Sequence, residues 1–159
     1  MKRSGFTMVE LIFVIVIVGI LAAVAVPKLA ATRDDAKVAR ISSDAARFVS
    51  DVGAYYTSKD TFGTATLGDI TNVEFGTVAA PTDTTTPLAG STLDLTDGEN
   101  VCLVFKPAAG GADGNMTISA GTGTGAICTE VRSVAIKSNI LGVNNADKNV
   151  SFSGTRVVQ

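Results

Sequence analysis

The sequence predicts an α+β fold in which a long N-terminal α-helix packs on a small antiparallel β-sheet head. Three observations lead to this class. Residues 11–26 are apolar and carry no charge, and residues 28–58 repeat apolar side chains at helical spacing. Residues 59–159 are rich in Thr, Gly, Ala and Asp and contain short β-type runs. We therefore expect a membrane-spanning or filament-core helix over 6–27, an amphipathic helix over 28–58 and a β-rich head over 59–159.

The first segment is long enough to cross a bilayer. A helix over 6–26 measures roughly 30 Å at about 1.5 Å per residue, which matches the hydrocarbon thickness. It holds one acid, Glu10, whose charge costs on the order of 2.5–3.5 kcal/mol at the bilayer centre and less near an interface. Two interpretations follow: the carboxylate snorkels to the headgroups at the positive helix end, or it neutralises a cation from another chain.

Pro27 stands inside the helical pattern. It should remove one backbone hydrogen bond and either kink the helix or let it melt locally. A plain interfacial bend with no role in assembly is the alternative.

The second segment has one apolar stripe and a charged face. The stripe is predicted to pack under the head, and it consists of Val38, Ile41, Ala45, Phe48, Val52 and Tyr55. Arg40 with Asp44 and Arg47 with Asp51 are spaced four residues apart. Each such pair contributes at most about 0.5 kcal/mol.

The head is predicted to contain an antiparallel sheet. Strands are expected at 73–78, 101–106, 116–119 and 150–158, the last with a turn or bulge at Gly154. Residues 81–92 and 107–114 are expected to be surface loops. Together with the second half of the helix, these strands suffice for a modest core.

The N-terminus resembles that of a known family. Residues 2–12 read Lys-Arg-Ser-Gly-Phe-Thr-Met-Val-Glu-Leu-Ile, which is similar to the start of the type IV pilins, a family that includes the pseudopilins of type II secretion. The resemblance extends over about residues 1–58. It implies a leader at 1–5, cleavage by a prepilin peptidase between Gly5 and Phe6, and methylation of Phe6 to N-methylphenylalanine. The family's glutamate falls on Glu10 and its helix-kinking proline on Pro27.

The resemblance also implies how subunits assemble. In a stack of parallel helices, Glu10 of one subunit meets the Phe6 amine of its neighbour, and two charges that are costly alone become tolerable as a pair. The helix between Gly19 and Pro27 is expected to loosen in a homo-oligomeric helical filament. An inner-membrane assembly platform and its ATPase are the implied partners. The subunit would cross the inner membrane once, N-terminus cytoplasmic, before entering a periplasmic or extracellular filament.

Several interpretations of the N-terminus remain open. The sequence barely distinguishes a pilin from a major pseudopilin of a type II secretion system. Lys2, Arg3, the apolar run and the small residues 23–25 also fit an ordinary signal peptide, which would release a soluble periplasmic binding module. Glu10 next to the apolar core and Pro27 directly after the first mature residue count against that reading. A plain single-pass membrane protein is a further alternative.

The chemistry of the head favours a structural role. Given the implied export, Cys102 and Cys128 are expected to form a disulfide rather than two buried thiols. The chain has no histidine, so we predict no enzyme activity and no cofactor. Acid and amide clusters at 94–100 and 144–147 offer oxygen ligands of the kind calcium takes in major pseudopilins, but their spacing favours solvated loops, and no metal site is predicted. A net charge of −2 gives no general attraction for nucleic acid.

Two Asn-X-Ser/Thr sequons occur, at Asn115 and Asn149, each with an acid two residues earlier, at Asp113 and Asp147. This pattern resembles the acidic sequon of bacterial N-glycosylation systems. Surface turns rich in Asp and Asn produce the same pattern by chance, and both interpretations remain open.

Overall fold

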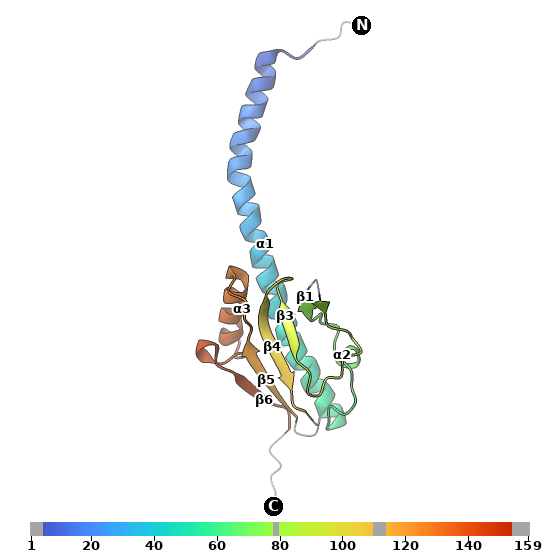
Figure 1. Cartoon of the computed structure of the whole chain (residues 1–159). Helices are drawn as coiled ribbons and strands as arrows, with labels where there is room; N and C mark the ends of the chain where they lie inside the picture. Colours follow the sequence, from blue (N-terminus) through green and yellow to red (C-terminus); the bar gives the residue numbers. More distant parts are fainter. Residues whose placement is uncertain (1–4, 78–79, 110–113, 154–159) are drawn as a thin grey trace, which may run out of the picture. The chain divides into compact units, whose positions relative to one another are not determined.

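A computed structural model describes residues 5–77, 80–109 and 114–153 of the chain (Figure 1). A long N-terminal helix is followed by a four-stranded antiparallel sheet, so the predicted α+β class is confirmed. The elements are α1 (Met8–Lys59), α2 (Leu67–Ile70), β1 (Gly76–Thr77), β2 (Ala80–Pro81), β3 (Leu93–Thr96), β4 (Val101–Pro107), β5 (Asn115–Ala120), α3 (Ala126–Lys137), η1 (Val143–Asn145) and β6 (Lys148–Ser151).

The chain divides into two compact units, Met1–Ala36 and Lys37–Gln159, and the boundary falls inside α1. The expected helix over 6–58 is present as Met8–Lys59 and stays helical through Pro27. The structure therefore shows no local melting at this proline. Every described residue from 5 to 37 is exposed.

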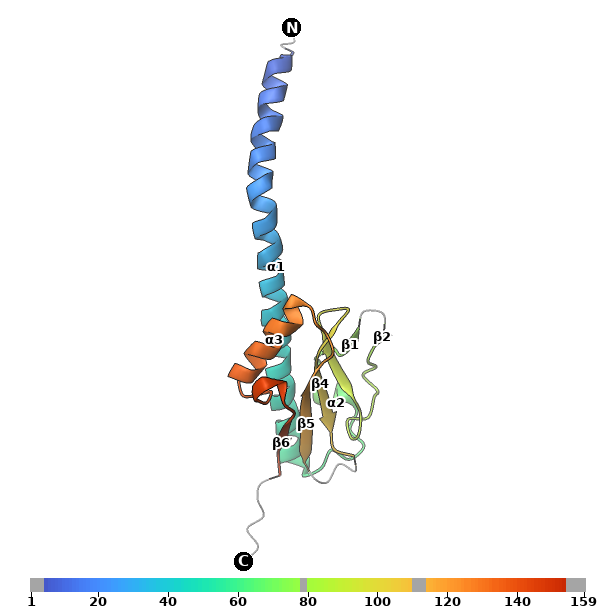
Figure 2. The same ribbon diagram turned by 60° about the vertical axis from the view of Figure 1, so that its left-hand side comes forward.

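The core of the second unit lies between the sheet and the second half of α1. The sheet has the order β3-β4-β5-β6, and Figures 1 and 2 both show it against the cyan-to-green part of the helix. The ring of Phe48 lies edge-on to those of Phe75 and Phe105, with centroids 4.8 and 5.1 Å apart. Such pairs add about 0.5–1.5 kcal/mol beyond burial of their area. Alternate residues of the strands point into this core: Leu93, Leu95, Leu103, Phe105, Met116 and Ile118.

The buried stripe of α1 differs from the prediction at its last position. Tyr56, not Tyr55, is buried, and its ring lies 5.2 Å from that of Phe62. At about 100° per residue, Tyr56 is about 40° from Val52 around the helix, whereas Tyr55 is about 60° away on the other side. Tyr55 is half-buried. The other five predicted stripe residues are buried as expected.

Both predicted ion pairs of α1 are present. Arg40 Nε lies 3.5 Å from Asp44 Oδ2, and Arg47 Nε lies 3.8 Å from Asp51 Oδ2. They lie on the partly exposed side of the helix, where such pairs contribute little.

The strand predictions were correct for the two central strands of the four-stranded sheet and wrong in their bounds for the other two, of which β1 pairs with β2 in a separate sheet. The expected strands at 101–106 and 116–119 are β4 and β5. In the predicted strand 73–78, only Gly76–Thr77 is paired, although Val73 and Phe75 are buried. The last strand begins earlier, at Lys148, and Gly154 with the rest of the predicted strand lies outside the described residues.

Other elements of the head were missed. Strand β3 has the alternating pattern Leu-Asp-Leu-Thr but is only four residues long. Within the predicted loop 81–92, Leu88 is fully buried. The largest omission is α3, whose β-branched residues lower its helix propensity. Its buried positions Cys128, Val131 and Ala135 are nevertheless spaced three and four residues apart.

The short helix α2 starts with a polar cap. The backbone N–H and the hydroxyl of Thr66 both donate to Asp69 Oδ2, at 2.9 and 2.7 Å. These donors hold the pKa of Asp69 below its usual range.

Truncating the buried tyrosine should cost far more stability than truncating its neighbour. We expect Tyr56→Ala to lower the free energy of unfolding by about 3 kcal/mol, because it empties a filled site in the core. Tyr55→Ala is the matched control and should cost less than about 1 kcal/mol. Urea unfolding of the detergent-solubilised chain measures both. Equal losses would contradict the assignment of Tyr56 to the core.

The cap of α2 predicts a response to acid. Because the folded-state pKa of Asp69 is lowered, its contribution to stability is present above the unfolded pKa and is lost as the pH falls through the folded one. Unfolding free energy should therefore drop below about pH 4, and Asp69→Asn should drop less steeply over that range. Urea unfolding from pH 5 to pH 2 measures the two slopes. Identical slopes would rule out this contribution.

Candidate processing and assembly site

The start of α1 is closed by a reciprocal cap between Thr7 and Glu10. The backbone N–H and the hydroxyl of Thr7 each donate to Glu10 Oε2 at 2.8 Å. In return, the Glu10 N–H donates to Thr7 Oγ1 at 3.3 Å. Thr7 thus occupies the N-cap and Glu10 the third helical position, which is the arrangement of a capping box. Sequence reasoning missed this role of Thr7, although Thr-X-X-Glu before an apolar run is its signal.

The cap gives the Glu10 carboxylate a local environment before any partner is considered. It lies at the positive end of the helix dipole and accepts hydrogen bonds of the kind that a carboxylate needs in an apolar environment. These bonds all use Oε2. Among the described residues, no hydrogen bond uses Oε1, which is therefore available as a further acceptor.

The predicted processing residues lie just outside this cap. Gly5 and Phe6 precede the first helical residue, Met8, and both are exposed, Phe6 by 85%. A peptide bond in this position is open to a protease without any unwinding of the helix. The Phe6 nitrogen is one residue before the N-cap, so the site brings Gly5, Phe6 and Glu10 into one short segment.

The helix beyond the cap is apolar on all sides. Exposed large apolar side chains run from Leu11 to Leu29, and a Cβ at Gly19 would meet nothing within 4 Å. Helix α1 is long and apolar enough to cross a membrane, and the relevant stretch is unburied. A helix with apolar residues all round needs lipid or other helices around it. Unit one therefore has the properties of a membrane anchor.

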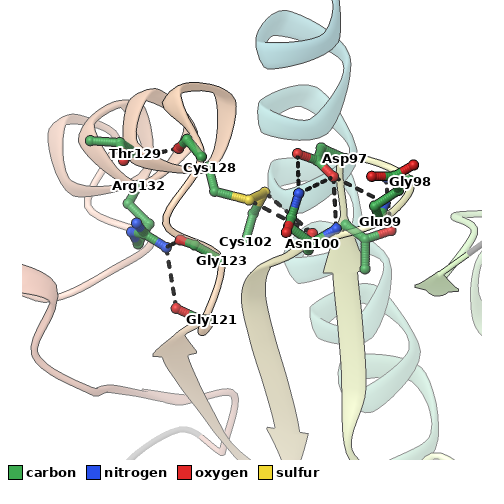
Figure 3. Close-up of a disulfide and its surroundings, with 12 residues drawn as sticks. Asp97, Gly98, Glu99, Asn100, Cys102, Gly121, Gly123, Cys128, Thr129 and Arg132 are labelled. Atoms are coloured by element: carbon green, nitrogen blue, oxygen red, sulfur yellow. Dashed lines mark hydrogen bonds between the residues drawn. A yellow bond between two sulfur atoms is a disulfide. The ribbon is translucent and has the colours of Figure 1, made fainter.

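The predicted disulfide is confirmed. Cys102 on β4 and Cys128 on α3 are bonded, with their Cα atoms 4.6 Å apart (Figure 3). Nearby, Arg132 Nη1 donates to the carbonyls of Gly121 and Gly123 at 3.2 and 2.7 Å. The disulfide holds the start of α3 to the beginning of β4, and the arginine holds α3 to the loop that precedes it.

The acid cluster at 94–100 forms a turn. Asp97 Oδ1 accepts from the N–H groups of Glu99 and Asn100 at 3.0 and 2.8 Å. Burial raises the pKa of Asp97, but these donors outweigh it and hold the pKa below its usual range. The Asp97 carboxylate lies near the sulfurs of Cys102 and Cys128, which are bonded to each other and are not thiolate ligands. The second cluster includes Asn144 and Asn145, both in the left-handed region at φ of 58 and 60°.

The two sequon asparagines lie on neighbouring strands. Asn115 is half-buried at the start of β5, and Asn149 is exposed in β6.

The cap can be tested separately from any assembly role. Thr7→Ala removes the cap hydroxyl and should cost about 0.5–2 kcal/mol of local helix stability. Glu10→Gln keeps the capping box, because glutamine also serves at this position. Amide hydrogen exchange of residues 8–11 in detergent micelles should therefore speed up in Thr7→Ala and change little in Glu10→Gln. Unchanged exchange in Thr7→Ala would exclude the cap.

One comparison with known proteins concerns the same N-terminal segment. Residues 1–26 match the prokaryotic N-terminal methylation motif. Over 46 residues the chain is 48% identical to the type IV narrow pilus major component PilA5 of Thermus thermophilus, a match covering 29% of this chain and 40% of that protein. No solved structure matches. The chain thus carries the prokaryotic N-terminal methylation motif and is similar in part to a type IV pilus component, and its fold is α+β with a long N-terminal helix.

Proposed function

We propose that this chain is a structural subunit of a type IV pilus-like filament. The observation that carries the proposal is the N-terminal motif on an apolar helix that the chain itself leaves uncovered. A helix of this kind is stable in a bilayer as a stored subunit and in a bundle of identical helices as a polymer. Subunits related by one repeated rotation and translation build such a bundle.

Assembly begins with processing. A prepilin peptidase hydrolyses the bond between Gly5 and Phe6, and residues 1–5 leave as the leader. Hydrolysis frees the α-amine of Phe6, which keeps its positive charge after N-methylation. The exposure of both residues and their position before the helix support cleavage of the folded subunit.

Glu10 sets the axial register of the filament. The Phe6 amine of a neighbour lies against Glu10 of the incoming subunit, and Oε1 accepts from it while Oε2 retains the Thr7 donors. In an apolar bundle an unpaired carboxylate is strongly destabilising, so subunits stop sliding where the two charges meet. Apolar contacts alone allow many axial offsets between neighbouring helices, and the charge pair selects one of them.

Gly19 and Pro27 bound the part of α1 that adapts to the bundle. Gly19 presents no side chain, and the alanines at 22, 23 and 25 allow close approach of neighbouring helices. Pro27 lacks the N–H of a regular helical residue, so the turn before it is held by fewer hydrogen bonds. We expect the helix between these residues to loosen on assembly.

The subunit is expected to cross the inner membrane once, with a cytoplasmic N-terminus and the head outside. The Cys102–Cys128 disulfide supports this orientation, because such bonds persist in oxidising compartments. Moving an apolar helix from lipid into a polymer outside the membrane requires work. An inner-membrane assembly platform and its ATPase are the partners that supply it. The similarity to a pilus component covers 40% of that protein, and a major pseudopilin of a type II secretion system is the alternative.

The mature N-terminus and the charge of Glu10 test the proposal together. Mass spectrometry of the membrane fraction should find N-methylated Phe6 at the start of the chain. Glu10→Gln should be processed and inserted like wild type but should reduce sheared extracellular fibres by at least tenfold, because its cap is intact and only the charge is lost. Thr7→Ala is the matched control and should retain fibres.

Three results would revise the proposal. A mature chain starting near Val26 would indicate ordinary signal peptidase and a soluble protein. Normal fibres in Glu10→Gln would remove the charge pair from the mechanism. A chain confined to the periplasm, whose deletion stops protein secretion, would identify a pseudopilin.

A further inference from the structure

The two sequons, far apart in the chain, lie directly opposite each other in the sheet. Strands β5 and β6 pair antiparallel, with Asn115 opposite Ser151 and Thr117 opposite Asn149. Each sequon asparagine therefore faces the hydroxyl residue of the other sequon. Cross-strand neighbours of this kind have Cβ atoms about 4.5–5.5 Å apart, and diagonal ones about 7–8 Å.

All four polar residues share the outer face of the sheet. Met116 is fully buried and Val150 packs on the core, so these alternate residues point inward. Lys148 also points to the inner side, where its Nζ donates to the carbonyl of Asn139 at 2.5 Å and to the Asn139 side chain. Since strand side chains alternate, Asn149 and Ser151 point away from the core.

The two asparagines differ in access. Asn115 is half-buried on β5, which has β4 on one side and β6 on the other. Asn149 is exposed on β6, the last strand of the sheet, and Asp147 two residues before it is exposed too. Asp113, the corresponding acid of the first sequon, lies outside the described residues. Asn149 is thus the more accessible of the two carboxamides.

We propose that Asn149 is the acceptor of an N-linked oligosaccharide and that Asn115 stays unmodified. The donor is a lipid-pyrophosphate-linked oligosaccharide. A bond forms between Asn149 Nδ2 and the anomeric carbon of the first sugar, while the bond from that carbon to the pyrophosphate oxygen breaks. The lipid pyrophosphate leaves with the electron pair, and the amide gives up one proton. This step rests on the proposed export of the head.

The register explains why a single site is used. A second oligosaccharide on Asn115 would start from the diagonal position, about 7–8 Å away, and the two chains would compete for the same space. A glycan on Asn149 projects from the outer face, opposite the side that packs against Phe48 of α1. The modification therefore leaves the core unchanged.

Site-resolved mass spectrometry of the full chain from native cells tests the proposal. Wild-type protein should carry one saccharide mass increment, on the peptide that contains Asn149. Asn149→Gln and Ser151→Ala should abolish it. Asn115→Gln should retain it, and Ser151→Thr, which restores a sequon hydroxyl, should retain it as well.

An unmodified Asn149 in native protein, or an increment on Asn115, would overturn the proposal. The same spectra report the N-terminal peptide. Methylated Phe6 together with unmodified Asn149 would contradict only the glycosylation proposal. A start other than Phe6 would instead contradict the proposed processing.

Discussion

The exposed apolar side chains between Phe6 and Leu29 are the constraint on which the rest of the structure depends. None of these residues is buried by the chain itself. Fully burying one Leu, Ile, Val or Phe side chain gains about 1.5–3 kcal/mol, so a long row of them creates a large demand for lipid or for neighbours. A charged group among these side chains is costly wherever lipid or other helices surround it. Glu10 is tolerated because Thr7 satisfies it locally, and any further partner must arrive from outside the subunit.

One face of the second half of α1 is buried by the chain's own head. From Lys37 onward the helix belongs to the head and supplies one wall of its core. Phe48, Phe75 and Phe105 form the centre of that core, and the disulfide holds α3 to β4 at its edge. One continuous helix thus contains two parts, and burial by the head begins at Val38, directly after Lys37. Pro27 lies in the first part.

The sequence carried strong information wherever one periodicity ran for many residues. The long helix, its buried stripe and its two ion pairs were predictable, because twenty or so residues of regular spacing outweigh local noise. Tyr56 was missed because two adjacent tyrosines lie almost equally near the buried face. Helix α3 was missed because Ile, Val and Thr favour strands locally, whereas its packing on the core and its bond to Cys102 are tertiary. Strand β3 was missed because its alternating pattern extends over only four residues.

The candidate site was predictable in part for the same reasons. A motif of fixed residues at fixed positions located Gly5, Phe6 and Glu10, but the hydrogen bonds of Thr7 required geometry. The sequence alone could not show that the two sequons lie opposite each other, because the register between β5 and β6 depends on which strands pair in the folded sheet. The cysteines were predictable as a pair, because the head contains no others.

The distance between the cap and the proposed cleavage site makes the exact position of the cut important. Under the proposed processing, the amine freed between Gly5 and Phe6 is one residue outside the cap, and the backbone group bonded to Glu10 within the subunit is the neutral amide of Thr7. A cut one residue later would turn that same nitrogen into a charged terminus already in contact with the carboxylate. The subunit would then neutralise its own acid, and nothing would remain to recruit a neighbour. In the proposed mechanism, the cleavage position therefore decides whether Glu10 pairs within its own subunit or with a neighbour.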